Sequence, residues 1–444
     1  MTELVVHPGT SPLRGVVAAP ASATMLQLAL TCAAVAERGA KSELEVKGCP
    51  PLPVVTTLRS LGVTIDQAER GLTVTGVGLD GLTPSPAEGP GEPSVLGALL
   101  GLLAPLSEVT RLLADAGPIA LQAAGAARAL RKRGAQIEGE LDPGRPGWLG
   151  PPWVVGPAPA PMSEVQLELA PREPAAKAAL LTSGLMALGD TFVHEPVVSD
   201  DRLERLLASM GVSIETLGPM LRLSPPASPL RPLTGPAPGD AGLSVAVLAA
   251  ALASTESQVG LRGVGVSPGR SGWLEGLRDA GVTLGLEGGG ERWGQPVADI
   301  HVAGRPLRPL SIAGERGHRA GVPLPLLAAL AAFAPGESVV CDVPLSHPAQ
   351  LPQTLRLLQA FGIPVRPVEQ GLAVTGGRPR ATTVEAAGEP TLAIAAAILA
   401  LGAEGPCRIT GAEVIGLSFP RFVGYLRGLG ATVDVNPDPP APSS

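Results

Sequence analysis

The chain has 444 residues, enough for two or three domains of ordinary size, and 45% of them are apolar, so that it can bury large cores. Aromatic residues make up only 2%, and therefore Leu, Val and Ala must fill those cores. The net charge of −7 gives no overall attraction to nucleic acid or to an anionic membrane surface, and neither is expected as a partner.

The N-terminal segment does not resemble a signal peptide, because no basic region precedes an apolar one. The longest apolar stretches are too short to cross a bilayer and are expected to form helices that are buried on all sides. They are Val245–Ala253, Leu324–Ala334 and Leu392–Leu401. The four cysteines form no CxxC pair, which favours buried thiols in a reducing compartment. The protein is therefore expected to be cytoplasmic.

One pattern recurs six times along the chain: a helical stretch, a glycine, and a short run of alternating apolar residues. The first copy is LRSLGVTI, residues 58–65, and the last is LRGLGATV, residues 426–433. At the end of a helix, glycine adopts the left-handed conformation without the steric cost of a Cβ atom. The apolar alternation after it indicates a half-buried strand. The shared glycines are Gly62, Gly134, Gly211, Gly281, Gly362 and Gly430.

These glycines are spaced roughly 70 to 80 residues apart. That period is longer than the unit of a solenoid, which has about 20–50 residues. It fits a βαβ unit with additional strands. The sequence therefore predicts an α/β protein built from six copies of one unit.

A segment rich in proline and glycine, residues 225–239, separates the third copy from the fourth, and Pro20 stands at the matching place before the first. We therefore expect two lobes of three repeats, joined by two crossings. Lobe I is expected to be discontinuous, with residues 1–20 and 232–444, and lobe II to comprise residues 21–231.

Three other segments are expected to be irregular. The proline-rich residues 143–161 are expected to form a loop or an edge segment. GGGERWG, residues 288–294, lacks the Lys-Ser/Thr ending of a phosphate-binding loop and is expected to form a hairpin or a loop. Residues 435–444 are expected to be a disordered tail.

Four long segments carry a resemblance to a known family: EPVVSDDRLERLLASMGV (195–212), GDAGLSVAVLAAAL (239–252), VGVSPGRSGWLEGLRDAGV (264–282) and SFPRFVGYLRGLG (418–430). They resemble segments of the enolpyruvyl transferases, most closely of the EPSP synthases of the shikimate pathway. The resemblance covers nearly the whole chain. It implies the two-lobe enolpyruvyl transferase fold, an inside-out α/β barrel with three βαβ-type repeats in each lobe.

The resemblance also implies a reaction, the transfer of an enolpyruvyl group from phosphoenolpyruvate to the 5-hydroxyl of shikimate 3-phosphate, without a cofactor or a metal ion. Both substrates are polyanions, so the site of the family needs Lys and Arg side chains that clamp phosphate and carboxylate groups. It also needs acid–base groups that move protons around the tetrahedral intermediate.

Six motifs of the family bind its substrates, and the first of them can be followed at the start of a helix. The motif P-G-S-K-S-x-x-x-R corresponds to residues 20–28, where Ala23 replaces the Lys and Leu28 replaces the Arg. The hydroxyl groups of Ser22 and Thr24 remain. Ser22 is also expected to cap the helix that begins near Thr24.

The motif S-A-Q-x-K-S corresponds to residues 173–178 and keeps Lys177. In the S-R segment that follows, Ser199 remains, whereas Asp200 replaces the Arg and reverses its charge. For Lys177 and Arg319, the alternative to a ligand contact is a cation on the surface of a helix.

The remaining motifs have also lost their charged groups. The motif that holds the proposed general base of the family, D-E-I-P, corresponds to Val-Pro-Leu-Pro at residues 322–325. G-N-x-G-T becomes Gly-Glu-Pro-Ser at 91–94, K-E-S/T-D-R becomes Ala-Gln-Leu-Pro-Gln at 349–353, and G-D-H-R becomes Gly-Glu-Pro-Thr at 388–391. No residue can therefore be assigned a catalytic role. The candidate substrate-binding residues are Ser22, Thr24, Lys177, Ser199, Arg319 and Glu389.

We therefore expect an EPSP synthase-like protein that lacks the standard catalysis, a binding or scaffolding homologue with a vacated anion site. Its cleft between the lobes would hold a less charged small molecule or a protein partner. The alternative is a divergent but active enolpyruvyl transferase, acting on shikimate 3-phosphate or on a changed substrate, with Lys177, Arg319 or Glu389 in new roles. A third possibility is a subunit that pairs with an active homologue.

Overall fold

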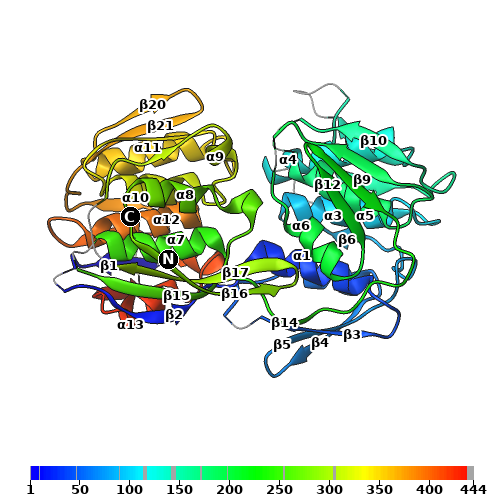
Figure 1. Ribbon diagram of the computed structural model, residues 1–444, viewed down its shortest axis with the longest axis horizontal. Coiled ribbons are helices and arrows are strands. Elements are labelled where there is room, and N and C mark those ends of the chain that lie inside the picture. Colours follow the sequence, from blue (N-terminus) through cyan, green and yellow to red (C-terminus); the bar gives the residue numbers. More distant parts are fainter. Residues whose placement is uncertain are drawn as a thin grey trace, which may run out of the picture.

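The computed structural model describes residues 2–9, 11–46, 48–89, 91–113, 118–141, 147–170, 173–197, 199–253, 256–303 and 307–437. This part of the chain contains six four-stranded sheets. They fall into two lobes of three sheets, with lobe I on the left and lobe II on the right of Figure 1. The predicted α/β architecture of six similar units is confirmed.

One unit of lobe II shows the order that all six share. It consists of β6 (Ala87–Glu88), α3 (Pro93–Leu103), β7 (Thr110–Leu113), α4 (Pro118–Lys132), β8 (Ile137–Leu141) and β9 (Leu149–Val155). β6 and β7 are parallel, and β9 lies between β7 and β8, antiparallel to both.

The expectation of a loop or edge segment at residues 143–161 is therefore wrong, because β9 is an interior strand. Pro151 and Pro152 fall outside the residues that pair with β7, and they lie at an irregularity in the pairing with β8. Proline has no N–H to donate, and this gap in the ladder is where a strand can tolerate it.

The other two units of lobe II follow the same order. The elements of one are β10 (Val165–Glu168), α5 (Pro174–Gly184), β11 (Thr191–His194), α6 (Arg202–Ser209), β12 (Ser213–Leu217) and β13 (Met220–Ser224). Those of the other are β14 (Thr234–Pro236), α1 (Ala23–Ala34), β3 (Lys41–Glu45), α2 (Val54–Ser60), β4 (Thr64–Ala68) and β5 (Gly71–Thr75).

Lobe I repeats the arrangement three times. Its first unit has β2 (Arg14–Ala18), α7 (Ala241–Ala253), β15 (Gln258–Gly265), the short 3-10 helix η1 (Pro268–Arg270), α8 (Gly272–Asp279), β16 (Leu284–Arg292) and β17 (Gln295–Ala303). The second has β18 (Ser311–Ile312), α9 (Glu315–His318), α10 (Leu324–Ala331), β19 (Gly336–Cys341), α11 (Gln350–Ala360), β20 (Val365–Val368) and β21 (Gly371–Gly376). The third has β22 (Thr383–Glu385), α12 (Pro390–Leu401), β23 (Cys407–Thr410), η2 (Ala412–Leu417), α13 (Phe422–Gly428), β24 (Val433–Pro437) and β1 (Thr2–Val6).

The chain crosses between the lobes twice, and each crossing leaves a strand in the lobe from which it departs. β2 precedes α1 in the sequence but pairs with β15 of lobe I, whereas β14 precedes α7 but pairs with β3 of lobe II. Leu233 and Ala237 belong to the core of lobe II. Both residues lie just beyond the boundary expected at residue 232, which stays a prediction.

The six glycines that define the repeat all have positive φ angles, from 70° to 105°. Each follows the second helix of its unit and precedes the first strand of the hairpin that completes the unit. The prediction of a left-handed residue at the end of this helix is confirmed in every copy.

The helix immediately before the second strand of each unit is buried at the centre of its lobe. In lobe II these helices are α1, α3 and α5, and in lobe I they are α7, α10 and α12, which contain the three long apolar stretches. Their residues belong to two separate hydrophobic cores, one in each lobe. Of the helices that the structure describes, none combines the length and the apolar character needed to span a membrane.

The C-terminal end of the fold is longer than expected. Val435, Asn436 and Pro437 belong to β24 and pair with Leu4, Glu3 and Thr2 of β1. The expectation of a disordered tail is therefore wrong for residues 435–437, and residues 438–444 lie outside the described residues.

Candidate functional site

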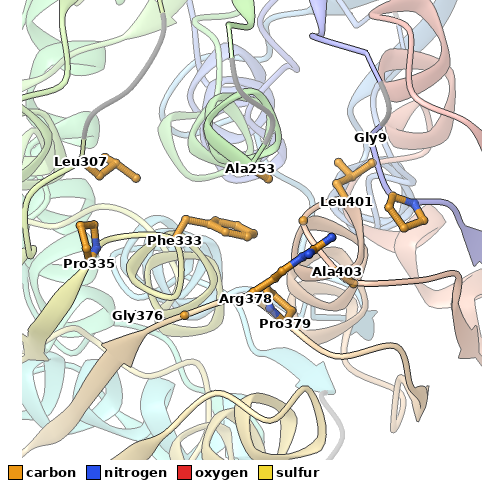
Figure 2. A pocket seen from close by; sticks show the side chains of 13 residues that line it. Gly9, Ala253, Leu307, Phe333, Pro335, Gly376, Arg378, Pro379, Leu401 and Ala403 are labelled. Atoms are coloured by element: carbon orange, nitrogen blue, oxygen red, sulfur yellow. The ribbon is translucent and has the colours of Figure 1, made fainter.

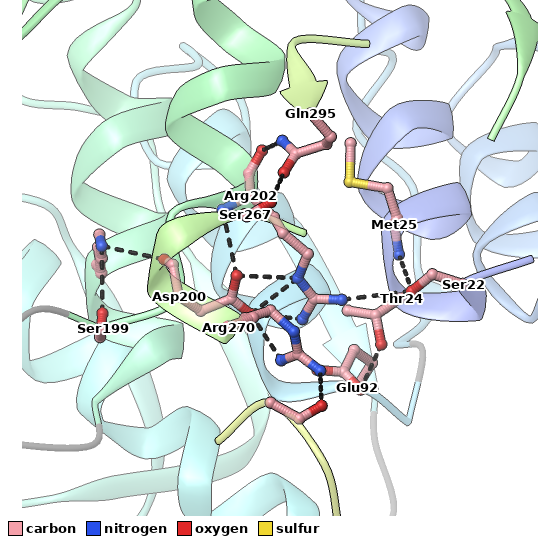
Figure 3. A network of polar contacts seen from close by, with 12 residues as sticks. Ser22, Thr24, Met25, Glu92, Ser199, Asp200, Arg202, Ser267, Arg270 and Gln295 are labelled. Carbon is pink, nitrogen blue, oxygen red and sulfur yellow. Dashed lines mark hydrogen bonds and ion pairs between the residues drawn. The ribbon is translucent and has the colours of Figure 1, made fainter. Parts of the chain in front are cut away.

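Most of the polar residues singled out in the sequence meet at the junction of the two lobes, drawn in Figure 3. Here the loop that ends at Asp201, just before α6 of lobe II, faces η1 of lobe I. The two backbones are so close here that a Cβ atom on Gly269 would stand 2.6 Å from the carbonyl oxygen of Ser199. Glycine in η1 therefore lets the lobes meet at this point.

The carboxylate of Asp200 lies at the centre of the junction. Arg202 donates from Nε to both of its oxygens, at 2.9 and 2.8 Å, and from Nη2 to Oδ2 at 2.5 Å. Arg270, from lobe I, donates from Nη1 to Oδ2 at 3.2 Å. Burial alone would raise the pKa of Asp200, but the charges of Arg202 and Arg270 outweigh it and hold this pKa well below its usual range. One carboxylate thus pairs with two guanidinium groups, one from each lobe.

Two further carboxyl groups surround this centre. Glu92, at the N-terminus of α3, accepts from Thr24 Oγ1 at 3.4 Å. Burial raises the pKa of Glu92, and the charge of Asp200 adds to the increase, whereas Arg202 opposes it. Asp240 accepts from the Leu243 N–H at the start of α7 and also acts electrostatically on Arg202. Two guanidinium groups therefore face three carboxyl groups.

Neutral side chains complete the network. Ser22 Oγ accepts from the Met25 N–H and so caps α1, as expected, and it also accepts from Arg202 Nη1 at 3.4 Å. Gln295 Nε2 donates to the Arg202 carbonyl oxygen at 2.9 Å and accepts through Oε1 from Ser267 Oγ at 2.5 Å. The cavity that these residues leave has a volume of about 20 Å³. A cavity of this size holds about one water molecule and no organic phosphate.

Lys177, on α5, lies next to this network in a cluster of its own. Its side chain is 5% exposed, and its Nζ pairs with Glu204 and, at 2.8 Å, with Glu195. It also donates to Ser199 Oγ and to the Asp200 carbonyl oxygen, both at 3.1 Å. Lys177 is thus not a cation on a helix surface, and its three N–H donors already have four acceptors within the protein.

The carboxyl group of Glu204 is the unusual member of this cluster. Burial raises the pKa of Glu204 to about 7, although the nearby charge of Lys177 opposes the increase. Its Oε2 atom is buried without a hydrogen-bond partner. A proton on Glu204 would relieve the cost of an unpartnered charge at this place.

The last two candidates lie away from Asp200. Arg319 flanks η1, donates to the Pro268 carbonyl oxygen at 3.0 Å, and pairs with Glu275 and Glu315, both at 3.3 Å. Glu389 caps α12 by accepting from the Thr391 N–H at 3.0 Å. Among the contacts of the described residues, none joins Glu389 to the Asp200 network.

The structure thus links Ser22, Thr24, Lys177 and Ser199 through one network and leaves Glu389 apart. Sequence reasoning missed Arg202 as a member. The only signal was its place in the run Ser-Asp-Asp-Arg at 199–202, where neighbouring opposite charges favour a local ion pair. Arg270 donates to the Gly321 carbonyl oxygen at 2.8 Å and also reaches Asp200.

A larger cavity, of about 540 Å³, lies in lobe I at the C-terminal ends of α7, α10 and α12 (Figure 2). Its lining is mostly glycine, proline, alanine and larger apolar residues such as Phe333 and Leu401, and Arg378 is the only charged residue among the described residues that line it. Arg378 complements the partial negative charge that helix C-termini carry. Within the described ranges, no group of His, Cys, Asp and Glu is arranged to hold a metal ion.

The fold is that of the enolpyruvyl transferases. The solved EPSP synthase from Acinetobacter baumannii superimposes with a TM-score of 0.85 at 24% identity, covering 98% of this chain and 100% of that one. The enolpyruvyl transferase NikO from Streptomyces tendae gives a TM-score of 0.74 at 18% identity, covering 99% of each chain. At these identities the likeness defines the fold alone.

Relatives at higher identity define the family. Proteins named 3-phosphoshikimate 1-carboxyvinyltransferase are 29% identical in Desulforamulus reducens, over 96% of this chain and 99% of the relative, and 31% identical in Prochlorococcus marinus, over 92% and 94%. The model of the EPSP synthase (3-phosphoshikimate 1-carboxyvinyltransferase) family matches residues 8–426. This chain belongs to the EPSP synthase family, as its sequence motifs predicted.

Proposed function

We propose that this member of the EPSP synthase family does not carry out the standard enolpyruvyl transfer and acts as a binding or scaffolding homologue. Its anion site between the lobes is filled by its own carboxyl groups. The observation that carries the proposal is the position of Asp200, whose carboxylate lies between Arg202 of lobe II and Arg270 of lobe I.

The charge balance at the junction opposes polyanionic substrates. Phosphoenolpyruvate and shikimate 3-phosphate need cations with free donors, whereas Lys177, Arg202 and Arg270 are all engaged with carboxylates of the chain. Two unit charges 4 Å apart repel by about 4 kcal/mol at an effective dielectric constant of 20. One such repulsion removes half of the roughly 8 kcal/mol that corresponds to micromolar affinity.

The acid–base groups are a second difficulty for catalysis. The segment that corresponds to the motif of the general base contains Val322 and Leu324, which are 3% and 1% exposed. Buried alkyl side chains cannot exchange protons with a substrate. Glu92 is a carboxyl group near the junction, but it is half-buried and already accepts a hydrogen bond from Thr24, and the cavity between the lobes has room for about one water molecule.

Calorimetric titration of the purified protein with shikimate 3-phosphate, alone and with phosphoenolpyruvate, tests the proposal. A phosphate-release assay on the same sample completes it. We expect neither heat nor phosphate, while a standard EPSP synthase treated in parallel gives both. Saturable heat with phosphate release would show that the protein is an active synthase and would end the proposal.

Enolpyruvyl transfer to shikimate 3-phosphate is the second candidate function, because the relatives that align with nearly the whole chain carry the name of that activity. The comparisons by themselves support this candidate more directly than the first. It requires Asp200 to withdraw so that Arg202 and Arg270 can face the substrates. Growth of an EPSP synthase-deficient strain without aromatic amino acids, when this chain is expressed, would establish it.

A further inference from the structure

We infer that Asp200 is a built-in anion that holds the two lobes together in the absence of any ligand. We refer to Asp200, Arg202 and Arg270 as the latch. The inference deepens the proposed function and rests on it, since it assigns to a side chain of the protein the place that a bound anion would take between the two arginines.

The ion pair between Asp200 and Arg270 differs in its position from the other ion pairs found between described residues. Those pairs join partners within one lobe, and this one crosses the junction. The side chains of Asp200 and Arg270 are 23% and 26% exposed, so solvent screens them only in part. The contact is therefore stronger than an ordinary surface pair of the same length.

Both halves of the latch are held in place before they meet. The Asp200 carbonyl oxygen accepts from Lys177, and its Oδ1 accepts from the Arg202 N–H at 3.1 Å. On the other side, Arg270 Nη2 is fixed by the Gly321 carbonyl oxygen. Little side-chain freedom remains to be lost when the pair forms, which favours the closed arrangement.

The other hydrogen bonds across the junction do not replace the latch, because they involve neutral side chains or carbonyl acceptors. Glu92 and Asp240 act electrostatically on Arg270 and Arg202, but among the described residues they form no ion pair across the junction. Trp293 and Arg292 donate to the Thr234 and Ala237 carbonyl oxygens, next to the strand that leads into the second crossing. The exposed Gln122 donates to the Ser346 carbonyl oxygen at 2.8 Å. Loss of the Asp200 carboxylate would remove the ion pair between the lobes and leave Arg202 and Arg270 to repel each other. Of the two carboxyl groups that remain, burial favours the neutral form of Glu92, so we expect the lobes to move apart.

The test is small-angle scattering of the full chain without ligand. A compact chain of this length has a radius of gyration of about 22 Å, and we expect Asp200→Ala to increase it by about 1–2 Å. Acetate should restore the value of the unmodified protein by filling the vacated carboxylate position, whereas chloride at the same ionic strength should not. Asp190→Ala is the matched control, since Asp190 pairs with Arg222 within lobe II at a similar exposure.

Each outcome decides the inference. An unchanged radius in Asp200→Ala, or an increase that acetate and chloride reverse equally, would overturn it. If Asp200→Ala does not fold, Arg270→Gln removes the crossing pair from the other lobe and should give the same expansion. The proposed function fails separately: turnover of shikimate 3-phosphate by the unmodified protein would disprove it, even if Asp200→Ala expanded and acetate restored it.

Discussion

Trp293, at the tip of the hairpin formed by β16 and β17, donates its indole N–H to the Thr234 carbonyl oxygen at 2.9 Å, so that a side chain of lobe I completes the core of lobe II. Both residues of its turn, Trp293 and Gly294, have positive φ angles, as two-residue hairpin turns of this kind require. Of the hairpin or loop expected at residues 288–294, the structure shows the hairpin. Its tip also contacts lobe II beside the second crossing of the chain.

Removal of this ring should destabilise the protein strongly. Trp293 is 6% exposed, and truncation of a buried aromatic residue costs about 3–5 kcal/mol of unfolding free energy. Trp293→Phe keeps most of the apolar contact but loses the indole hydrogen bond. It should cost about 1 kcal/mol for that hydrogen bond, in addition to the cost of the smaller apolar area that it buries. Denaturant unfolding of both variants measures the two values. Equal stability of Trp293→Ala and the unmodified protein would mean that the hairpin is not part of the core of lobe II.

The glycine of the repeat can be tested at a single helix. Gly430, after α13, has a φ of 105°, and no atom lies within 4 Å of the position that a Cβ would take, so Gly430→Ala should cost about 1–2 kcal/mol through backbone strain alone. Gly424, within α13, is equally unobstructed but has no positive φ. Gly424→Ala should stabilise by up to about 1 kcal/mol, as helix propensity predicts. Thermal unfolding should therefore shift in opposite directions for the two variants.

The six-unit fold could be predicted because its signals are local. Each glycine needs only its own backbone conformation, and the buried helices of lobe I are marked by long apolar runs such as Leu392–Leu401. The strands at the crossings give no such signal. β2 and β14 pair with strands that lie roughly 240 and 190 residues away in the sequence, and nothing within them indicates which lobe they join.

The candidate site could be predicted only in outline. The resemblance to the family motifs located Ser22, Lys177 and Ser199, and it placed uncharged or acidic residues such as Ala23 and Asp200 where the motifs have Lys or Arg. The partners of Lys177 were not visible, because Glu195 and Glu204 reach it from a loop and from α6. From the sequence alone, Lys177 was therefore expected to contact a ligand or to lie on the surface of a helix. In the structure, its Nζ pairs with two carboxyl groups of the protein instead.

Lys177 should consequently be required for stability. Lys177→Met leaves Glu195 and Glu204 without their cation, and breaking a buried pair in this way costs about 3–5 kcal/mol. Lys177→Arg keeps the charge and should cost less. Urea unfolding distinguishes these variants, and a Lys177→Met protein as stable as the unmodified one would show that the lysine is dispensable for the fold.

The pH dependence of stability should report on Glu204. Its pKa is raised by burial from 4.5 to about 7, so the folded protein holds a proton that the unfolded chain releases within this range. The resulting stabilisation is fully present below pH 4.5 and is lost as the pH rises through 7, a change of up to about 3 kcal/mol. Relative to the Glu204→Gln variant, the unmodified protein should therefore have a higher unfolding free energy at pH 5 than at pH 8. An identical difference at both pH values would contradict the assignment.

A gain of binding is the sharpest check on the charge argument. Ala23 is the first residue of α1, next to Ser22, and a helix N-terminus favours an anion once carboxylates no longer crowd it. The double variant Ala23→Lys, Asp200→Asn adds one positive charge to the junction and removes one negative charge, which frees the donors of Arg202 and Arg270. We expect it to bind shikimate 3-phosphate with measurable heat but not to release phosphate, because Val322 and Leu324 still occupy the segment that we align with the motif of the general base.

The control is Asp190→Asn, which changes the charge within lobe II only and should give no heat in the same titration. If the double variant is also silent, carboxylate crowding is not what excludes the substrate, and the small volume left between the lobes must be responsible.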